Sequence, residues 1–479
     1  MTMTIGQPNQ SDVIVVGAGI GGLVAAVRAA ELGLRVCILE QGDDEAYPCN
    51  TRYSGGIVHA AFHDVNRPAD ELSAILAKAT DSAADSRLVA TVATDGRRLL
   101  AFLQTHGVRF MRFSTAEAHR WCMAPPRPIG PGLDWKGRGP DVLLKTLAQA
   151  LRKHGGTIQF GARAQSLQME NGRCVGVIGT LKGAEHRWPA KAVVLADGGF
   201  QANRAMLREH IGPNPDAILQ RGASNGHGDG LKMATAAGAA TRGLTIFYGH
   251  LLGRDALTNP DVWPYPELDG VAATAIVVTP DGKRFFDEGL GGISLTNAIA
   301  RLRDPASTTL ICDAAIWEGP GRSARFPANP YLEKFGGTLL RADTLAELAA
   351  KANIDGAGLA KTVQDYNAAL DAGQLGALTP ARSTKKTAAL PITGAPYIAI
   401  PLCAGITYTM GGIVIDGDGQ AQRADGTAIP GLYASGTTTA GLDVSADGAS
   451  VGYVGGLIKA VFGLRASERI AKEVGVKAL

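Results

Sequence analysis

The chain has 479 residues, of which 19% are charged, and a formal net charge of +3, so the length suggests about three domain-sized units of roughly 150 residues. The charges form no block of one sign and no run of about 18 apolar residues occurs, so neither a nucleic-acid partner nor a membrane span is indicated. The six cysteines include no CxxC pair, which argues against an iron–sulfur cluster or another metal site. Residues 1–10 are polar and lack the basic flank and apolar core of a signal peptide, and we therefore expect a cytoplasmic protein.

The first predicted elements form a strand, a glycine turn, a helix and a second strand. In residues 12–16, DVIVV, four apolar β-branched residues follow Asp12, and the turn GAGIGG comes next. The helical stretch 23–32 stops at Gly33, and the second strand, 34–39, ends in Glu40. This order is typical of a dinucleotide-binding unit.

Each glycine of the turn has a physical role in such a unit. Gly17 permits the sharp turn, Gly19 lets the backbone approach a pyrophosphate, and Gly22 lets the helix pack against the strand. The free N–H groups at the helix start favour the anion. Glu40 is placed to accept hydrogen bonds from ribose hydroxyls and disfavours a 2′-phosphate. The alternative is a Rossmann layer that binds no ligand.

Two loops follow that contain candidate binding residues. In residues 50–57, NTRYSGGI, small residues beside a hydroxyl would let a flat ring approach backbone N–H groups, although a flexible loop has the same composition. After a helical pattern at 87–106, the loop 112–139 either covers a ligand or is an arginine-rich surface loop. It contains Arg112, Arg120, Trp121, Arg127, Trp135 and Arg138.

The next stretch completes the first part of the chain. A helix is predicted at 141–154, and a small β segment is predicted from strands at 157–160, 162–168 and 174–178. The buried-strand pattern 191–195 ends in ADGGF. A second glycine-bearing strand end of this kind belongs where a dinucleotide passes the carboxyl edge of a sheet.

Seven motifs in order resemble the flavoproteins of the fumarate reductase and succinate dehydrogenase superfamily. They are GAGIGG with Glu40, NTRYSGG, LADGGF, GHGDGLKMATAAGA, VVTPDGKRFFDE, YTMGGIVID and IPGLYASG. The superfamily includes soluble fumarate reductases, 3-ketosteroid dehydrogenases and tricarballylate dehydrogenase-like enzymes. The resemblance implies an α/β fold in which a Rossmann-like, GR2-type FAD-binding domain (1–243 and 392–479) carries an inserted α+β capping domain (244–391).

The resemblance also implies the cofactor, FAD, and the residues that hold it. The matching positions are Gly17, Gly19, Gly22, Glu40, Gln41, Asn50, Thr51, Ser54, Gly55, Gly56, Ala164, Ala196, Asp229, Gly436, Ser450 and Val451. Ser450 and Val451 match two amides that open the last helix and face the pyrimidine edge of the flavin. A helix N-terminus there would stabilise the negative charge of a reduced flavin.

The sequence departs from the superfamily at three places. Thr437 replaces a glutamate that contacts FAD, and Gly292 and Ile293 occupy the position of the proton-transferring arginine or tyrosine. A second arginine is missing from residues 443–450. Because guanidinium groups hold carboxylates as a fork, fumarate or succinate is not the expected substrate.

By resemblance, His250 and Tyr408 are the candidate catalytic residues, with Tyr265 and Tyr397 as weaker alternatives. The implied reaction is the desaturation or reduction of a C–C bond next to a carbonyl or carboxyl group of a small substrate. A Tyr or His would transfer the proton and flavin N5 the hydride.

The reaction needs a separate electron donor or acceptor, because the chain has no CxxCH haem motif. Two other classes stay open: an FAD oxidase or monooxygenase, and a catalytically degenerate FAD-binding protein.

Overall fold

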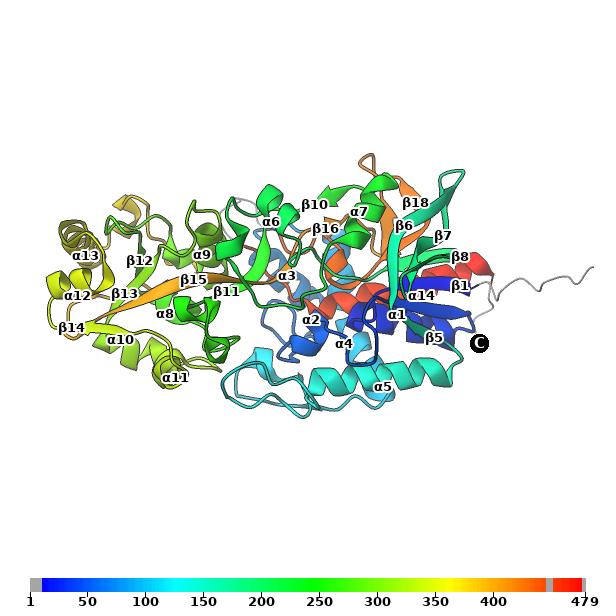
Figure 1. Cartoon of the computed structure of the whole chain (residues 1–479), viewed down its shortest axis with the longest axis horizontal. Helices are drawn as coiled ribbons and strands as arrows, with labels where there is room; N and C mark the ends of the chain where they lie inside the picture. The colour runs from blue at the N-terminus through cyan, green and yellow to red at the C-terminus, as the bar shows by residue number, and fades with distance from the viewer. Residues whose placement is uncertain (1–10, 445–450, 476–479) are drawn as a thin grey trace, which may run out of the picture.

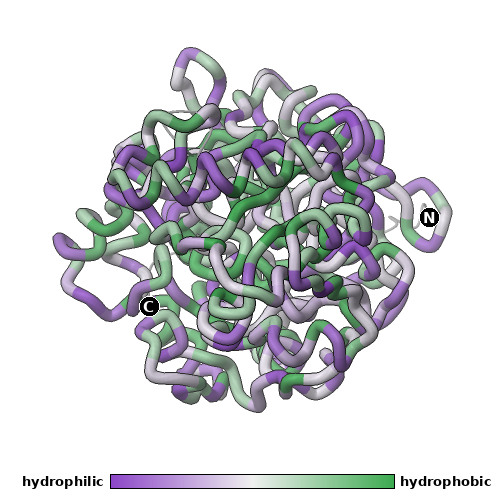
Figure 2. Tube along the Cα trace, turned by 90° about the vertical axis from the view of Figure 1, so that its left-hand side faces the viewer, coloured by the Kyte–Doolittle hydropathy of each residue, from purple (hydrophilic) through white to green (hydrophobic). Residues whose placement is uncertain are grey.

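The computed structural model of the protein describes residues 11–444 and 451–475. Two regions lie side by side along the long axis of the molecule (Figure 1). Viewed end-on, hydrophobic segments gather in the middle and hydrophilic segments line the rim (Figure 2).

The first region is built on a parallel sheet. Its strands, in spatial order, are β17 (Gln420–Gln422), β18 (Ala428–Ala434), β8 (Ala184–Leu195), β1 (Ser11–Val16), β2 (Val36–Glu40) and β5 (Thr157–Phe160). Only the edge strand β17 runs antiparallel within this order. Val15 pairs with Ile38 on one side and with Val194 on the other, and all three are fully buried. Such continuous apolar runs are expected of parallel strands that are covered on both faces.

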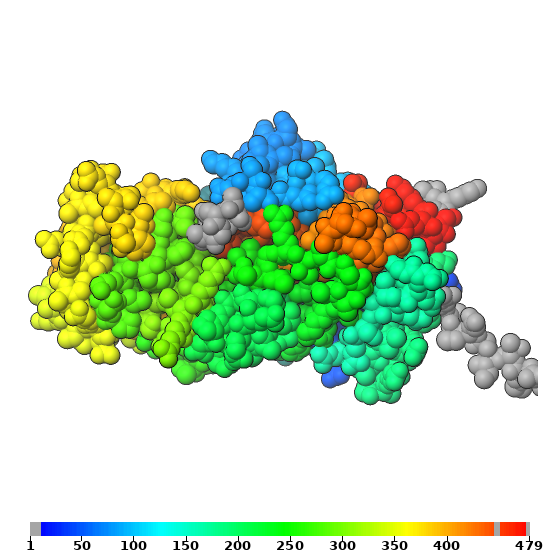
Figure 3. Space-filling view, turned by 90° about the horizontal axis from the view of Figure 1, so that it is seen from above, coloured from blue at the N-terminus to red at the C-terminus, as the bar shows by residue number. Residues whose placement is uncertain are grey.

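Five helices lie on one side of this sheet: α1 (Ile20–Glu31), α3 (Ala69–Ala79), α4 (Ser86–Thr105), α5 (Gly139–Lys153) and α14 (Val461–Val474). Helices α1, α5 and α14 contact the strands, while α4 packs on α14 and α3 packs on α4. Helices α1 and α14 pack closely, because a Cβ at Gly463 would lie only 2.8 Å from the Gly21 oxygen. The Ser467 hydroxyl also donates to the Ala25 carbonyl (2.7 Å). The segment of α3 and α4 forms a raised mass on one face of the molecule (Figure 3).

An antiparallel layer adds to the parallel sheet. The hairpin of β6 (Ala162–Glu170) and β7 (Arg173–Leu181) turns at Asn171 and Gly172 and pairs with the first part of β8. The predicted strands are thus confirmed here. Strand β8, however, starts at Ala184, earlier than the apolar pattern 191–195 indicated, because its first half is a polar hairpin partner.

The second region contains a six-stranded sheet with helices around it. The strands are β11 (Phe247–Gly253), β15 (Tyr397–Thr409), β13 (Thr309–Asp313) and β12 (Ile276–Val278), with β14 (Leu340–Ala342) and β9 (Leu219–Gln220) also on β15. The helices are α8 (Asp269–Thr274), α9 (Gly292–Ala300), α10 (Ala314–Glu318), α11 (Ala328–Lys334), α12 (Leu345–Ala352) and α13 (Gly356–Asp371). Strand β15 crosses from this region toward the first one (Figure 1), so the passage back lies inside a continuous strand, beyond residue 391.

Short elements complete the chain. They are α2 (Asn50–Tyr53), β3 (Phe110–Met111), β4 (Cys122–Met123), α6 (Arg204–His210), α7 (Asp229–Ala236), β10 (Thr241–Arg242) and β16 (Gly412–Ile413). A 3-10 helix, Leu457–Ala460, leads directly into α14. Among the described residues, no helix is both long and apolar enough to cross a membrane.

Candidate active site

One elongated cavity runs from the glycine turn after β1 to the sheet of the second region. Its wall includes the predicted residues Gly17, Gly19, Glu40, Gln41, Asn50, Thr51, Ser54, Gly55, Gly56, Ala164, Ala196, Asp229, His250, Tyr408 and Gly436. Of the other predicted residues, Gly22 and Val451 do not line this wall, and Ser450 lies outside the described residues. Residues from distant parts of the chain thus meet around a single space.

The glycine turn has the backbone geometry that a close-lying ligand needs. Gly17 has φ +96°, and a Cβ there would lie 2.7 Å from the Ala196 oxygen. A Cβ at Gly22 would lie 2.0 Å from the Gly17 oxygen, so this glycine serves the packing of α1 on β1. At Gly19 a Cβ would contact only Thr51 Oγ1, at 3.5 Å. Gly19 therefore leaves its cavity side open in front of the helix start, which attracts anions.

Glu40 ends β2 at the edge of the cavity. Its carboxylate is 4% exposed and accepts hydrogen bonds from the Ala18 N–H (3.0 Å) and the Gly42 N–H (2.9 Å). Burial raises the pKa of Glu40. The neighbouring Gln41 donates from Nε2 to the Asn225 carbonyl (2.8 Å), which joins this strand end to the loop before α7.

Asp197, which follows β8, was not among the predicted site residues, although its motif was. Its Oδ2 accepts from the Gly230 N–H (2.7 Å), while Oδ1 is buried without a hydrogen-bond partner among the described residues. Burial raises the pKa of Asp197 to about 7. A buried oxygen without a partner on the cavity wall is where a ligand hydroxyl would donate a hydrogen bond.

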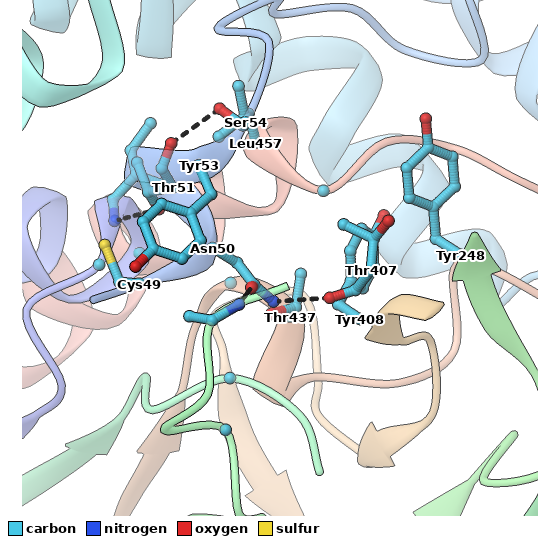
Figure 4. Close-up of a pocket in the computed structure, with 18 of the residues that line it drawn as sticks. Cys49, Asn50, Thr51, Tyr53, Ser54, Tyr248, Thr407, Tyr408, Thr437 and Leu457 are labelled. Atoms are coloured by element: carbon cyan, nitrogen blue, oxygen red, sulfur yellow. Dashed lines mark hydrogen bonds between the residues drawn. The ribbon is translucent and has the colours of Figure 1, made fainter. Parts of the chain in front are cut away.

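Helix α2 and the residues after it form the middle of the cavity wall. Asn50 donates to the Thr407 carbonyl (3.1 Å) and accepts from the Ala223 N–H (2.7 Å), so it ties α2 to β15 (Figure 4). The Ser54 hydroxyl donates to the Thr51 carbonyl (2.8 Å). Gly55 and Gly56 follow, and they leave this part of the wall without side chains.

The opposite wall differs from the prediction at the start of the last helix. The helical run begins at Leu457 and not at the predicted Val451, and Gly455, Gly456 and Leu457 line the cavity. The Val451 N–H donates to the Ser294 hydroxyl (3.0 Å) and is therefore engaged away from the cavity. A stretch rich in small residues, GASVGYVGG, gives no sequence signal for the exact residue at which the helix starts.

At the far end of the cavity, three side chains form a hydrogen-bonded chain. The Tyr248 hydroxyl lies 2.9 Å from His250 Nε2, and His250 Nδ1 lies 2.6 Å from Asp269 Oδ2. Asp269 Oδ1 also accepts from the Leu251 N–H (2.7 Å), which fixes the carboxylate on β11. His250 Nδ1 thus faces Asp269, and Nε2 faces both the Tyr248 hydroxyl and Glu267 Oε1 (3.4 Å), a carboxylate that Arg221 also contacts. Neither Tyr248 nor Asp269 was predicted from the sequence.

Tyr408, the other predicted catalytic residue, lies beside this chain. Its ring centroid is 5.2 Å from that of Tyr248, and Tyr453 stacks on Tyr248 at 4.4 Å. Figure 4 shows Tyr248 and Tyr408 in the same pocket on different elements. The Tyr408 hydroxyl is buried next to the Tyr453 side chain. Burial, the largest cause, raises the pKa of both tyrosines well above the usual value.

The positions where the superfamily places its arginine or tyrosine are filled differently. Ile293 packs against the apolar cluster that contains Tyr408 and Tyr453. At Gly292, a Cβ would lie 2.3 Å from the Asp269 Cβ. The absence of a side chain at 292 therefore makes room for the carboxylate that holds His250.

Of the two weaker catalytic candidates, one lines the cavity and the other does not. Tyr265 lines the cavity and stacks on Phe326 with ring centroids 3.7 Å apart. Tyr397 lies off the cavity and donates to the Thr393 carbonyl. The cavity wall also includes Arg221 and Arg325, for which the sequence predicted no role, and Arg127, whose loop was predicted either to cover a ligand or to lie on the surface. Among the described residues, no cluster of side chains could hold a metal ion.

Together, the parallel sheet, the glycine turn, the buried acid after β2 and the long cavity define a dinucleotide-binding protein with a second region over its site. Residues 12–452 match the FAD binding domain family, and the chain belongs to this family. FAD is therefore its cofactor, and the open backbone at Gly19 and the unpartnered oxygen of Asp197 fit such a ligand.

Curated and solved relatives span most of the chain. A probable fumarate reductase, Ifc3, of Shewanella frigidimarina is 26% identical over 450 residues, which are 91% of this chain and 71% of the relative. The open conformation of a flavocytochrome c3 fumarate reductase has 25% identity and a TM-score of 0.68, over 98% of this chain and 79% of that one. The 3-ketosteroid delta1-dehydrogenase from Sterolibacterium denitrificans shares the fold, with a TM-score of 0.71, 21% identity and coverage of 97% and 100%.

Proposed function

We propose that the protein is an FAD-dependent oxidoreductase that desaturates or reduces a C–C bond next to a carbonyl or carboxyl group of a small organic or cyclic substrate. Membership of the FAD binding domain family supports the cofactor, and relatives that are named as a fumarate reductase and a ketosteroid dehydrogenase support this class of reaction. The carrying observation is the Tyr248–His250–Asp269 chain, which opens onto the cavity that begins at the glycine turn.

The residues that hold FAD in this proposal lie on the cavity wall between the glycine turn and Gly56. Gly17, Gly19 and the start of α1 would receive the pyrophosphate, and Glu40 the ribose. The stretch from Asn50 to Gly56 would lie against the flavin ring. When bound, FAD supplies a hydride acceptor or donor.

The protein's own part is the movement of one proton. Burial keeps the Tyr248 phenol protonated, so this group cannot act as a free tyrosinate. It can receive a substrate proton only while its own proton moves to His250 Nε2, 2.9 Å away. Asp269 stabilises the imidazolium that results, as a buried carboxylate does in other relays. In the direction of reduction, the same groups return the proton. Tyr408, beside Tyr248, can donate a hydrogen bond that polarises the substrate carbonyl.

The experiment is an anaerobic titration of the FAD-loaded protein, followed by flavin absorbance, with succinate, tricarballylate and a 3-ketosteroid. Wild-type protein is expected to bleach with one class, or to reoxidise with an activated alkene after dithionite. Tyr248→Phe and His250→Ala should lower the rate by roughly 10²- to 10⁴-fold, because each interrupts the proton path, and leave the FAD content unchanged.

Tyr397→Phe is the matched control, because this tyrosine lies in the same region but off the cavity. Wild-type rates in both Tyr248→Phe and His250→Ala would refute the proposed proton path. A degenerate FAD-binding protein, which the glycine and isoleucine at 292 and 293 would suit, would retain FAD but respond to no substrate.

We also infer a separate electron donor or acceptor, since the sequence has no haem motif.

All six cysteines are free, and burial raises the pKa of Cys49, on the cavity wall, to about 12. Free, protonated thiols support a reducing compartment, and we propose the cytoplasm.

A further inference from the structure

Three arginines that match no superfamily arginine line the cavity. Arg127 comes from the loop before α5, Arg221 follows β9, and Arg325 lies between α10 and α11. Their positions in the sequence are far apart, which is why no motif indicated that they meet.

Arg221 has its charge balanced inside the protein. Its Nη2 donates to Glu267 Oε1 and to the Pro264 carbonyl, both at 2.9 Å, and its Nη1 donates to Thr407 Oγ1 at 2.9 Å. This arginine has a structural role between β9, β15 and the loop before α8.

Arg127 and Arg325 have no such balance. Arg127 is 4% exposed, donates to the Tyr53 carbonyl (2.6 Å) and has a buried Nε without a partner. Arg325 has a buried Nε and Nη2 without partners, and its guanidinium lies over the rings of Phe113 (3.9 Å) and Phe326 (4.8 Å). Neither arginine forms an ion pair with a carboxylate among the described residues.

Such cations require an anion. A guanidinium group stays charged in proteins, and burying a charge without a partner is costly unless a counter-ion completes the site. Aromatic rings cover the faces of Arg325, and its Nε and Nη2 are enclosed, so Nη1, beside Gly55, is the nitrogen that faces the cavity. A carboxylate oxygen there would form a charged hydrogen bond with the guanidinium.

The two arginines flank the same short segment of the wall. A Cβ at Gly55 would lie 3.0 Å from Arg325 Nη1 and 3.7 Å from the Tyr265 hydroxyl. Arg127 holds the carbonyls of Tyr53 and Ser54 (2.6 and 3.3 Å), directly before that glycine. The two free cationic groups and the Tyr265 hydroxyl thus surround the wall against which the flavin ring is proposed to lie.

We propose that Arg127 and Arg325 bind a carboxylate of the substrate, with Tyr265 as an additional donor. The proposal rests on the function proposed above and names its substrate class, an unsaturated or saturated carboxylic acid. The phosphates of FAD are an alternative source of anionic oxygens. They are assigned to the turn at Gly17 and Gly19, at the opposite end of the cavity.

The test is a binding experiment on oxidised, FAD-loaded protein, in which no turnover is needed. Crotonate and cinnamate, each paired with its neutral amide, are titrated while the perturbation of the flavin spectrum is recorded. At least one carboxylate should bind roughly 10- to 100-fold more tightly than its amide, because charged hydrogen bonds are lost in the amide. Arg325→Gln and Arg127→Gln should abolish this preference, and Arg325→Lys, which keeps the charge but loses the fork, should retain part of it.

Arg303→Gln is the control, because Arg303 is an exposed arginine of the same region. Equal binding of acid and amide by wild-type protein would overturn the proposal, as would an unchanged preference in Arg325→Gln. Loss of FAD from that variant would also overturn it and assign the anion to the cofactor. Efficient bleaching by a neutral ketone that Arg325→Gln leaves unchanged would overturn the carboxylate site but retain the oxidoreductase. A preference for the carboxylate without any redox response of the flavin would support the carboxylate site but overturn the proposed oxidoreductase function.

Discussion

Asp197 is the residue whose charge the fold disfavours most clearly at the cofactor end of the cavity. Its pKa is raised to about 7, chiefly by burial, with the carboxylates of Asp229 and Glu40 as smaller causes. In the native protein Asp197 therefore binds more protons than in the unfolded chain between pH 4 and 7. The contribution of Asp197 to stability falls as the pH rises through this interval, and its cost is fully present above pH 7.

Replacing Asp197 with asparagine should remove this dependence. The amide keeps an acceptor for the Gly230 N–H but carries no charge. We expect FAD-free Asp197→Asn to be more stable than FAD-free wild-type protein at pH 8, by at most roughly 4 kcal/mol at 1.36 kcal/mol per pKa unit, and to lose this advantage at pH 4. Urea unfolding of both proteins from pH 4 to 8 measures the difference. A difference that does not change with pH would contradict the assignment.

Residues in local patterns could be predicted from the sequence, and residues that meet only after folding could not. The glycines and Glu40 lie within one strand–helix–strand unit, where spacing alone fixes their positions. Tyr248 is a neighbour of the predicted His250, but nothing in the sequence indicates that its hydroxyl reaches the imidazole. Arg325 is further removed, since only the packing of two loops brings it to Gly55.

At the scale of elements, the contact between α8 and α9 positions the proton relay. Helix α9 begins at Gly292 and approaches Asp269, at the start of α8, so closely that the glycine has no room for a side chain. The sequence showed that the usual arginine or tyrosine was missing there. It did not show that Asp269, whose carboxylate holds His250, occupies the space that a side chain at residue 292 would need.

Gly292→Ala should therefore impair the relay without touching the cavity. Its Cβ would have to displace Asp269, and the 2.6 Å bond to His250 Nδ1 would lengthen or break. We expect the flavin bleaching rate to fall roughly 10- to 100-fold, since the imidazolium loses its partner, while the FAD content stays at the wild-type level. Gly270→Ala is the control: it also lies in α8, next to Asp269, and a Cβ there contacts nothing within 4 Å. An active Gly292→Ala protein would show that Asp269 is dispensable.

The elements of the first region could be predicted because the hydrophobic period of each element, and the glycine or polar residues that end it, are local features of the sequence. Four elements lie within a few residues of their predicted positions: the strands at 12–16 and 157–160, the helix after the glycine turn and the helix at 141–154. The second region was harder to predict from the sequence, because its sheet depends on pairings between residues that are far apart in the chain, such as His250 with Gly405 on β15. The motif VVTPDGKRFFDE, residues 277–288, forms the end of β12 and a single bridge between Val278 and Arg284.

At the scale of the whole molecule, the cavity couples the two regions. Asn50, from the first region, donates to the Thr407 carbonyl near the end of β15, and β15 pairs with β11, which carries Tyr248 and His250. A ligand that orders the wall at Asn50 should consequently also restrain the far strands. Binding to the native state alone lowers the population of opened states in proportion to ligand concentration over Kd.

Hydrogen exchange with and without FAD tests this coupling. At about 100 times Kd, amides in β1, β11 and the end of β15 should exchange up to roughly 100-fold more slowly when their exchange requires opening of the cavity wall. Helix α13, at the opposite end of the molecule from β1 (Figure 1), is the internal control and should change least. Protection confined to β1 and α1 would mean that the second region opens independently of the cofactor. The proton relay would then be assembled by the substrate and not by FAD, and the effect of Gly292→Ala would depend on substrate concentration.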